Sequence, residues 1–167
     1  MRPTPPTFLI LDANVLIDFC KSDRSMLTLI ARHIGRVAVA QPVLDEVESL
    51  GHGDLLELGL DLVMPETEML LEAAAKRGAL SFEDRICLLL AKDRGWTCVT
   101  NDGRLRRECK SNSIFVLWGL EPLAMLVERK VIDSKVALET ALAIQRSNPR
   151  FITEEIIRRF KDRLGMR

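Results

Sequence analysis

The sequence predicts an α/β protein in which helices cover both faces of a central parallel sheet, so that the molecule has three layers. Three observations favour this fold class. Short apolar runs, typical of strands that are buried on both faces, alternate along the chain with helical patterns. Such alternation indicates a parallel sheet with connecting helices. From Pro122 onwards only helical patterns occur, which we interpret as a helical C-terminal extension.

The length and composition predict one soluble globular domain. The chain has 167 residues, of which 47% are hydrophobic and 29% are charged. We place the core at about 8–117 and the helical extension at about 118–167. No apolar run approaches the ~20 residues that a membrane-spanning helix needs, and the N-terminal segment lacks the pattern of a signal peptide. We therefore expect a cytoplasmic protein that does not enter a membrane.

Net charge and cysteine usage exclude two further classes. The formal net charge is zero, which argues against a protein that coats nucleic acid by bulk electrostatics. The four cysteines contain no C-x-x-C pair and the two histidines lie far apart, so a zinc site is not expected. We expect the cysteines to behave as small core residues in a reducing compartment.

The N-terminal half alternates between strand patterns and helical patterns. The expected strands are short apolar runs at 8–11, 37–40 and 61–64. One expected helix opens at 15–19, and three further helices are expected at 25–34, 42–50 and 66–76. Pro42 fits the first turn of its helix, and Gly35 fits the end of another. We interpret Gly51-His52-Gly53 as a turn that ends the helix at 42–50.

The C-terminal half continues this order. A helix that begins after Ser81 and ends near Arg94 is apolar on nearly every side, which indicates burial. Ser81 fits its N-cap, with Asp84 three residues later as in a capping box, and Gly95 ends it. The remaining expected strands are 97–99 and 114–117, and the remaining expected helices are 104–110, 123–130, 134–145 and 153–164.

Four carboxylates stand where these elements begin or end. Asp12 and Asp102 each follow a strand, whereas Glu46 and Asp84 are expected in the first turns of helices. Because ligands of parallel sheets bind beyond the carboxyl ends of the strands, these acids are expected to converge. At ~4 Å each pair of like charges costs roughly 4 kcal/mol at a surface-like dielectric. A hard divalent cation such as Mg²⁺ or Mn²⁺ would offset that cost, which indicates metal-assisted chemistry on phosphate.

Each acid also has a purely structural interpretation. Asp12 and Asp84 would cap helices, Glu46 would complement a helix N-terminus, and Asp102 would be an ordinary turn residue. Taken alone, none of the four is decisive. Their common order and context favour a shared site.

Neighbouring acids compete for the same roles. Asp45 and Glu48 are alternatives to Glu46. Glu83 stands beside Asp84, but adjacent helix residues point in different directions, and we therefore leave Glu83 out of the expected site.

The four segments resemble, in order, the four motifs of PIN-domain nucleases. Leu-Ile-Leu-Asp-Ala-Asn-Val-Leu-Ile at 9–17 resembles their apolar strand followed by Asp-x-Asn, and Val-Leu-Asp-Glu-Val at 43–47 resembles the motif that supplies a glutamate. The segment 80–95 resembles their buried helix that opens with aspartate and ends in glycine. Cys-Val-Thr-Asn-Asp at 98–102 resembles a strand that ends in Thr-x-Asp. The resemblance covers roughly 8–117.

This resemblance implies a PIN-like fold and a metal-dependent endoribonuclease. Asp12, Glu46, Asp84 and Asp102 would hold one or two Mg²⁺ or Mn²⁺ ions, and Asn14 and Thr100 would orient the carboxylates or a water. The helical tail resembles that of small prokaryotic PIN proteins, many of which are VapC-type toxins of toxin–antitoxin pairs. The implied partners are an RNA substrate, a small antitoxin protein and a second copy of the chain.

Basic residues follow the last motif. Arg104, Arg106 and Arg107 are candidates to hold the RNA backbone, although a solvated helix face is the alternative for at least one of them. The chain has no Tyr and few Phe or Trp residues that are candidates for exposure. Recognition of single strands through an aromatic platform is therefore not expected, and any specificity would come from RNA shape.

Three rival functions remain. A haloacid-dehalogenase-like phosphatase also opens with an apolar strand that ends in Asp, but its chemistry needs a second Asp where this chain has Asn14. A PIN fold kept as a non-catalytic nucleic-acid-binding or scaffold module would usually have lost one of the four acids. A housekeeping RNA-processing nuclease without an antitoxin has the same sequence features as a toxin.

Overall fold

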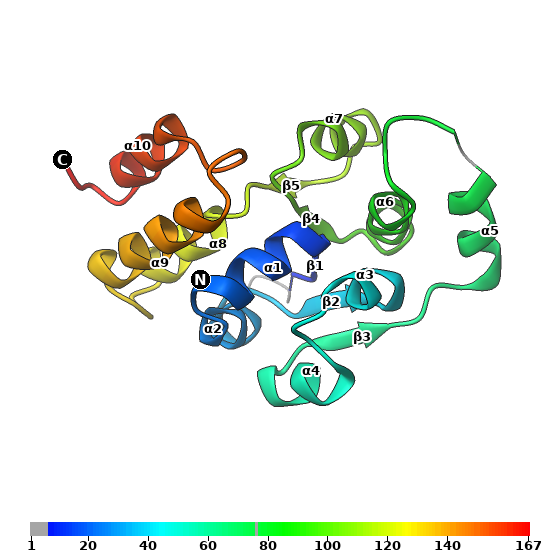
Figure 1. The fold of residues 1–167 in the computed structure, drawn as a ribbon, viewed down its shortest axis with the longest axis horizontal. Helices are drawn as coiled ribbons and strands as arrows, with labels where there is room; N and C mark the ends of the chain where they lie inside the picture. Colours follow the sequence, from blue (N-terminus) through cyan, green and yellow to red (C-terminus); the bar gives the residue numbers. More distant parts are fainter. Residues whose placement is uncertain (1–6, 76) are drawn as a thin grey trace, which may run out of the picture.

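The computed structural model describes residues 7–75 and 77–167 and has a three-layer α/β/α architecture (Figure 1). Its central sheet has five strands in the order β3-β2-β1-β4-β5, and every pair of neighbours is parallel. The fold class expected from the sequence is confirmed. The strands are β1 (Leu9–Leu11), β2 (Val37–Ala40), β3 (Asp61–Val63), β4 (Thr97–Val99) and β5 (Val116–Leu117).

The central position of β1 explains its uninterrupted apolar sequence. Leu9 pairs with Val37 of β2 on one side and with Thr97 of β4 on the other. Helices also cover both faces, so Leu9, Ile10 and Leu11 are all buried. A strand with two neighbours and two covered faces has no polar side, as the continuous apolar run predicts.

The strand order divides the connecting helices between the two faces. From β1 the chain moves outwards to β2 and β3, and after α5 and α6 it crosses back to β4 and β5 on the other side of β1. Since parallel crossovers are right-handed, helices before β3 lie on one face and those after it on the other. The first group is α1 (Ala13–Ser22), α2 (Ser25–His33), α3 (Gln41–Glu46) and α4 (His52–Leu58); the second is α5 (Thr67–Ala75), α6 (Phe82–Arg94) and α7 (Gly103–Ser111).

The C-terminal extension packs against the first group of helices. It consists of α8 (Glu121–Glu128), α9 (Ser134–Ser147) and α10 (Glu154–Arg163), which lie together at the yellow-to-red end of the chain (Figure 1). α8 contacts α2, α9 contacts α1, and α10 contacts both α8 and α9. Ile152, Ile157 and Phe160 belong to the same hydrophobic core cluster as β1. The extension therefore shares its core with the sheet.

One expected turn is a helix in the structure. The expected helix at 42–50 ends at Glu46, and Gly51-His52-Gly53 opens α4 instead of ending a helix. The Asp54 carboxylate accepts a hydrogen bond from the Gly51 N–H at 2.7 Å, and buried Leu55 anchors the helix to the core. The interpretation of Gly51-His52-Gly53 as a turn was wrong, because the side chain of Asp54, the third residue of α4, caps the start of this helix.

Two smaller points concern the expected elements. Lys76, the last residue of the expected helix at 66–76, lies outside the described residues. Within the described ranges, no helix combines the length and the apolar character that crossing a membrane requires.

Candidate functional site

The pairing of β1 with β4 brings two of the expected motifs into contact. Leu11 pairs with Val99, so the next residues, Asp12 and Thr100, emerge side by side at the carboxyl ends of their strands. The Thr100 hydroxyl donates a hydrogen bond to Oδ2 of Asp12. The same hydroxyl accepts one from the backbone N–H of Asp102 at 3.0 Å. Thr100 therefore links the carboxylate of Asp12 to the backbone of Asp102 through a single oxygen.

Asp12 is almost completely buried, with 1% of its surface exposed. Its Oδ1 caps α1 by accepting a hydrogen bond from the Val15 N–H at 2.8 Å. Burial raises the pKa of Asp12 to about 7, although the hydrogen bonds from Thr100 and Val15 lower it, and the charge of Asp84 adds to the rise. The expected capping role and a place in a charged cluster are thus both observed.

Asp102 also combines a cap with a free oxygen. Its Oδ1 accepts hydrogen bonds from the backbone N–H groups of Arg104 and Leu105, at 2.8 and 3.1 Å, at the start of α7. Within the described residues, Oδ2 accepts no hydrogen bond. An N-cap needs only one acceptor atom, so the second carboxylate oxygen is available for another ligand.

Asp84 lies in the first turn of α6, as expected from the sequence. Ser81 caps this helix by accepting a hydrogen bond from the Asp84 N–H at 3.1 Å. Partial burial raises the pKa of Asp84, and the neighbouring charge of Asp102 raises it further. Hydrogen bonds from Ser81 act in the opposite direction.

Glu46 joins the group from the end of a helix. It is the last residue of the six-residue α3, which contacts α6, and not a first-turn residue as expected. Partial burial raises the pKa of Glu46, followed by the effects of Glu83, through its charge and a shared hydrogen bond, and of Asp84. Glu83, which was left out of the expected site, is therefore a fifth acid of the cluster. In the first turn of α6, two successive side chains both reach this group despite their different directions.

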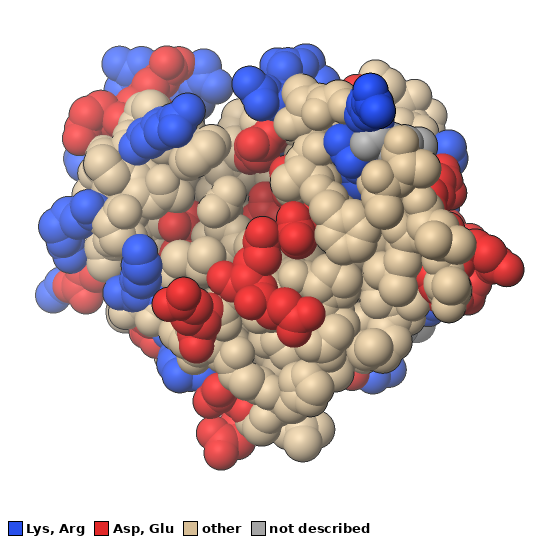
Figure 2. Space-filling view, turned by 45° about the vertical axis from the view of Figure 1, so that its right-hand side comes forward, with Lys and Arg blue, Asp and Glu red and all other residues tan. Residues whose placement is uncertain are grey.

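We call Asp12, Glu46, Glu83, Asp84 and Asp102 the acidic edge. The arrows of β2 and β3 point to the right in Figure 1, and this side comes forward in Figure 2, where acidic side chains gather around a hollow. Across residues 7–75 and 77–167, none of the ion pairs involves an acid of this edge. Among the described residues, the site therefore concentrates negative charge without an ion pair to a cationic side chain.

The donor chemistry of the acidic edge fits a hard divalent cation. All five groups offer carboxylate oxygens, which Mg²⁺ and Mn²⁺ prefer. Within the described part of the chain, however, no group of three or more His, Cys, Asp or Glu side chains lies close enough together to hold a metal ion. Side-chain rotation would have to bring the oxygens together, and the Oδ2 of Asp102 is one that no hydrogen bond occupies within the described residues.

The other expected site residues occupy different environments. Asn14 is exposed, and its side chain makes no hydrogen bond within the described ranges. Arg104 and Arg107 are exposed on α7, and Arg104 donates to the Ala79 carbonyl at 3.5 Å. Arg106 is only 8% exposed, because its guanidinium packs 3.4 Å from the centre of the Trp118 ring. The expected contacts of these arginines with RNA stay predictions.

One buried acid was missed entirely. Asp18 of α1 accepts hydrogen bonds from the Asn148 side chain at 3.0 and 3.2 Å, which ties α1 to the end of α9. Burial raises the pKa of Asp18 to about 6, and its charge contributes to the raised pKa of Asp12. The available sequence signal is a single acid between Ile17 and Phe19 in an apolar stretch.

Comparison with known proteins supports the fold. No protein-family model and no curated protein sequence matches the chain. A solved structure of a PilT N-terminus (PIN) domain protein from the hyperthermophilic archaeon Sulfolobus solfataricus P2 has a similar fold, with a TM-score of 0.56 and 12% sequence identity. The similarity covers 73% of this chain and 95% of that one. At this identity it shows a PIN-like fold alone.

Proposed function

We propose that this protein is a divalent-metal-dependent endoribonuclease that hydrolyses phosphodiester bonds with Mg²⁺ or Mn²⁺. One observation carries the proposal: the acidic edge crowds carboxylates beyond the carboxyl ends of β1 and β4 in a PIN-like fold. Burial, together with the charges of neighbouring acids, raises the pKa values of Asp12, Glu46 and Asp84. None of the acids of this edge forms an ion pair within the described residues. Such crowding costs stability unless a positive ion enters.

The proposed chemistry divides between the metal and the side chains. A bound divalent ion would lower the pKa of a water and offset charge on the phosphoryl oxygens. Asp12, Glu46, Asp84 and Asp102 would hold it. Thr100 would fix the rotamer of Asp12 by donating to Oδ2, while the Val15 N–H holds Oδ1.

Buried Asp12 also has a role in proton release. Because its pKa is about 7 in the metal-free protein, the carboxyl group exchanges its proton near neutral pH. The approach of a cation favours the ionised form, so metal binding would release this proton. Exposed Arg104 and Arg107, at the start of α7, would hold the phosphate backbone near the acidic edge.

Calorimetry tests the site directly. We would titrate Mg²⁺ and Mn²⁺ into the wild-type protein and into an Asp12→Asn, Asp102→Asn double variant, with Asp93→Asn as a control that removes an exposed acid from α6. We expect binding that the double variant loses and the control keeps. Cleavage of a single-stranded RNA should follow the same pattern. A double variant that binds metal as the wild type does would refute the proposed site.

A second candidate, a non-catalytic nucleic-acid-binding or scaffold module, is favoured by one observation. No three potential ligands in residues 7–75 and 77–167 lie within metal-binding distance of one another. If the wild type binds no metal alone, the titration should be repeated with a single-stranded oligonucleotide present. Binding that then emerges supports a site completed by RNA phosphate, and continued absence supports the module.

We further propose a toxin of a toxin–antitoxin pair that acts in the cytoplasm and is neutralised by a small antitoxin protein. The resemblance of the segments 117–120 and 150–153 to the tails of small prokaryotic PIN proteins supports this role. Induced expression in a bacterial host should stop growth for the wild type but not for Asp84→Asn. Growth that continues with the active enzyme would instead favour a housekeeping RNA-processing nuclease.

A homodimer is part of the same proposal. The exposed apolar residue Leu71 on α5 supports it, because the resemblance implies a second copy and α5 is an apolar helix. Sedimentation at micromolar concentration should show a dimer. A monomer throughout that range would exclude this part of the proposal.

A further inference from the structure

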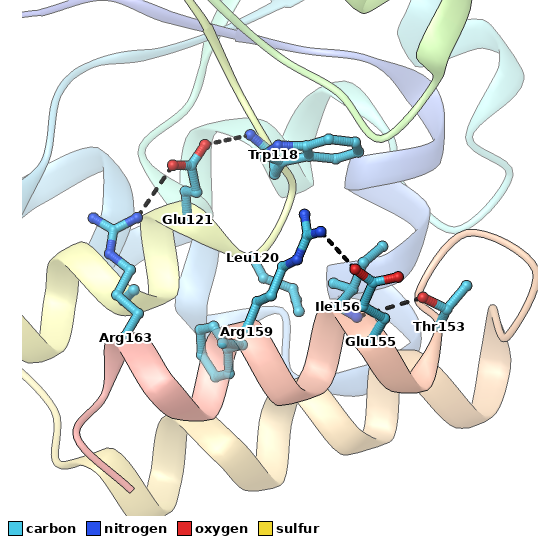
Figure 3. A pocket seen from close by; sticks show the side chains of 10 residues that line it. Trp118, Leu120, Glu121, Thr153, Glu155, Ile156, Arg159 and Arg163 are labelled. Carbon is cyan, nitrogen blue, oxygen red and sulfur yellow. Dashed lines mark hydrogen bonds and ion pairs between the residues drawn. The ribbon is translucent and has the colours of Figure 1, made fainter.

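A cavity of about 340 Å³ lies between the segment after β5 and helix α10 (Figure 3). This volume falls within the range of pockets that hold small organic groups, about 300–1,000 Å³. Trp118, Thr153, four apolar residues and four charged residues line it. The apolar residues are Leu120, Ala124, Ile156 and Phe160, and the charged residues, which we call its rim, are Glu121, Glu155, Arg159 and Arg163. We call it the Trp118 cavity.

The Trp118 ring is held in place before any ligand arrives. The guanidinium of Arg106 covers one face of the ring at 3.4 Å, and Arg106 does not line the cavity. The backbone N–H of Trp118 donates to the Glu121 carboxylate at 2.6 Å. The residue is nevertheless 39% exposed and lines the cavity.

Arg106 supports the ring through stacking. Nη1 of Arg106 is buried and has no hydrogen-bond partner among the described residues, and burial lowers the pKa of this guanidinium. A planar cation that lies flat on an indole ring gains a cation–π interaction in place of hydrogen bonds. In this structure the Arg106 guanidinium lies against Trp118, and its expected contact with the RNA backbone stays a prediction.

Arg159 provides a second planar group. Figure 3 shows its side chain rising from α10 towards the Trp118 ring, with Glu155 beside it. Arg159 pairs with Glu155 at 2.5 Å, and Arg163 pairs with Glu121 at 3.1 Å. Each acid on the rim is therefore balanced by an arginine. A neutral cavity with planar walls favours a flat, uncharged group over a free ion.

The cavity adjoins the acidic edge through one hydrogen bond. Asn101 stands between Thr100 and Asp102, and its Oδ1 accepts a hydrogen bond from the Gly119 N–H at 2.8 Å. A Cβ on residue 119 would lie 2.5 Å from Nδ2 of Asn101, so only glycine allows this approach. Trp118 is thereby fixed next to the residues that follow β4.

We propose that the Trp118 cavity binds an unpaired nucleobase, stacked between the Trp118 ring and the Arg159 guanidinium, while the backbone of the same strand continues to the acidic edge. Bases stack on aromatic rings and on guanidinium planes, and such stacking tolerates every base. The identity of the strand as RNA rests on the proposed function. This inference differs from the sequence-based expectation that single strands are not recognised through an aromatic platform.

Tryptophan fluorescence tests the inference without any catalysis. The chain has two tryptophans, and Trp96 stacks on Phe8 at a ring distance of 5.3 Å. A Trp96→Phe variant therefore leaves Trp118 as the single reporter. We would titrate this variant with a single-stranded ten-nucleotide oligouridylate in EDTA. We expect quenching of the Trp118 emission by the single strand and none by an RNA duplex of equal length.

Affinity measurements on variants complete the test. Trp118→Ala should weaken oligouridylate binding on the order of tenfold, the effect of losing one base–aromatic stack. Arg159→Ala, whose side chain is 74% exposed, should weaken it less without disturbing the fold. Phe115→Ala is the matched control, because Phe115 is 83% exposed but precedes β5 at the opposite edge of the sheet. It should bind as the wild type does.

Several outcomes would overturn the inference. They are binding without quenching, unchanged affinity in both Trp118→Ala and Arg159→Ala, and no oligouridylate binding at all. A Trp118 emission that changes on dilution but not with RNA would assign the cavity to a second copy of the chain. Quenching without metal-dependent cleavage would retain the cavity and refute the nuclease. Cleavage without quenching would retain the nuclease and refute base binding in the cavity.

Discussion

The acidic edge and the C-terminal extension treat their carboxylates in opposite ways. In the extension, Arg163 donates to Glu128 at 2.9 Å and to Glu121 at 3.1 Å, and Arg159 pairs with Glu155. At the acidic edge, the charges that act on Asp12, Glu46 and Asp84 are those of other acids, and no acid of this edge forms an ion pair within the described residues. One region satisfies its charges locally, whereas the other leaves them unsatisfied.

This difference separates charges that serve the fold from charges that await a ligand. Exposed ion pairs such as those of the extension contribute only about 0–1 kcal/mol each to stability. Crowded and partly buried acids lower stability, because burial and repulsion both disfavour the ionised form. Since crowding does not help the fold, the acidic edge is the better candidate for function.

The largest effect is expected from a substitution that removes the charge of Asp102 but keeps its side chain as the N-cap of α7. Asp102→Asn preserves a good N-cap for α7 and removes the charge. We expect RNA cleavage to fall on the order of 10²-fold or more, with little change in the free energy of unfolding in EDTA. Asp102→Ala should lose the same activity and about 1 kcal/mol of stability as well. Cleavage assays and urea denaturation would measure the two effects. Full activity in Asp102→Asn would show that the cap alone matters.

A smaller effect should follow from loss of the hydroxyl that joins two acids. Thr100→Val removes the donor to Asp12 and the acceptor for the Asp102 N–H. We expect a loss of about 10–100-fold in metal affinity or activity, the usual range for groups that orient metal ligands. Thr100→Ser should restore most of it because the hydroxyl returns. Equal defects in both variants would assign the effect to packing.

Next in size is a pH effect at the junction of the two regions. The pKa of Asp18 is raised from 3.8 to about 6, so the folded state retains a proton that the unfolded chain has released. The free energy of unfolding should therefore fall as pH rises from about 4 to about 6.5, with a contribution on the order of 2 kcal/mol from Asp18.

The control for this effect uses two neutral substitutions. Asp18→Asn should make the decline with pH less steep, because Asp12, Glu46 and Asp84 still contribute to it, whereas Asp162→Asn on the exposed side of α10 should leave the slope unchanged. Urea denaturation between pH 4 and 7 in EDTA measures both. An unchanged slope in Asp18→Asn would mean that Asp18 is already ionised in the folded protein at low pH.

The smallest effect is expected within the extension. Arg163→Gln removes the contacts of α10 with Glu121 and Glu128 on α8. We expect a loss of about 0.5–1 kcal/mol in the free energy of unfolding, and less at high salt. Arg158→Gln, on the same helix and exposed, should have no effect. Equal losses in the two variants would contradict the comparison between the regions.

The sheet and most of its acids could be predicted because their signals are local. Three successive apolar residues of β1 followed by Asp12 indicate a buried strand and its carboxyl end. Ser81 and Asp84 form a helix start whose cap is observed in the structure. Strand order cannot be obtained from such signals alone, but the carboxyl ends of parallel strands all lie at one edge of the sheet, whatever their order.

The remaining features depend on contacts between distant segments. Nothing near Arg106 in the sequence indicates that its guanidinium lies against Trp118 and not in solvent. The partner of Asp18 is Asn148, 130 residues away. Glu83 was excluded by a rule about adjacent helix residues that does not hold when a partner acid, here Glu46, approaches from another helix.

The central place of β1 has a consequence for the order of events during synthesis. β1 has two neighbouring strands. β2 follows it closely in the sequence, whereas β4 is not complete until Val99. At about 5–20 residues per second, roughly 3–12 s pass between completion of β2 and completion of β4. For that time one side of β1 lacks its neighbouring strand, and Asp102 of the acidic edge has not yet been synthesised. A nascent chain therefore lacks the complete site while it is still growing beside the RNA of the ribosome.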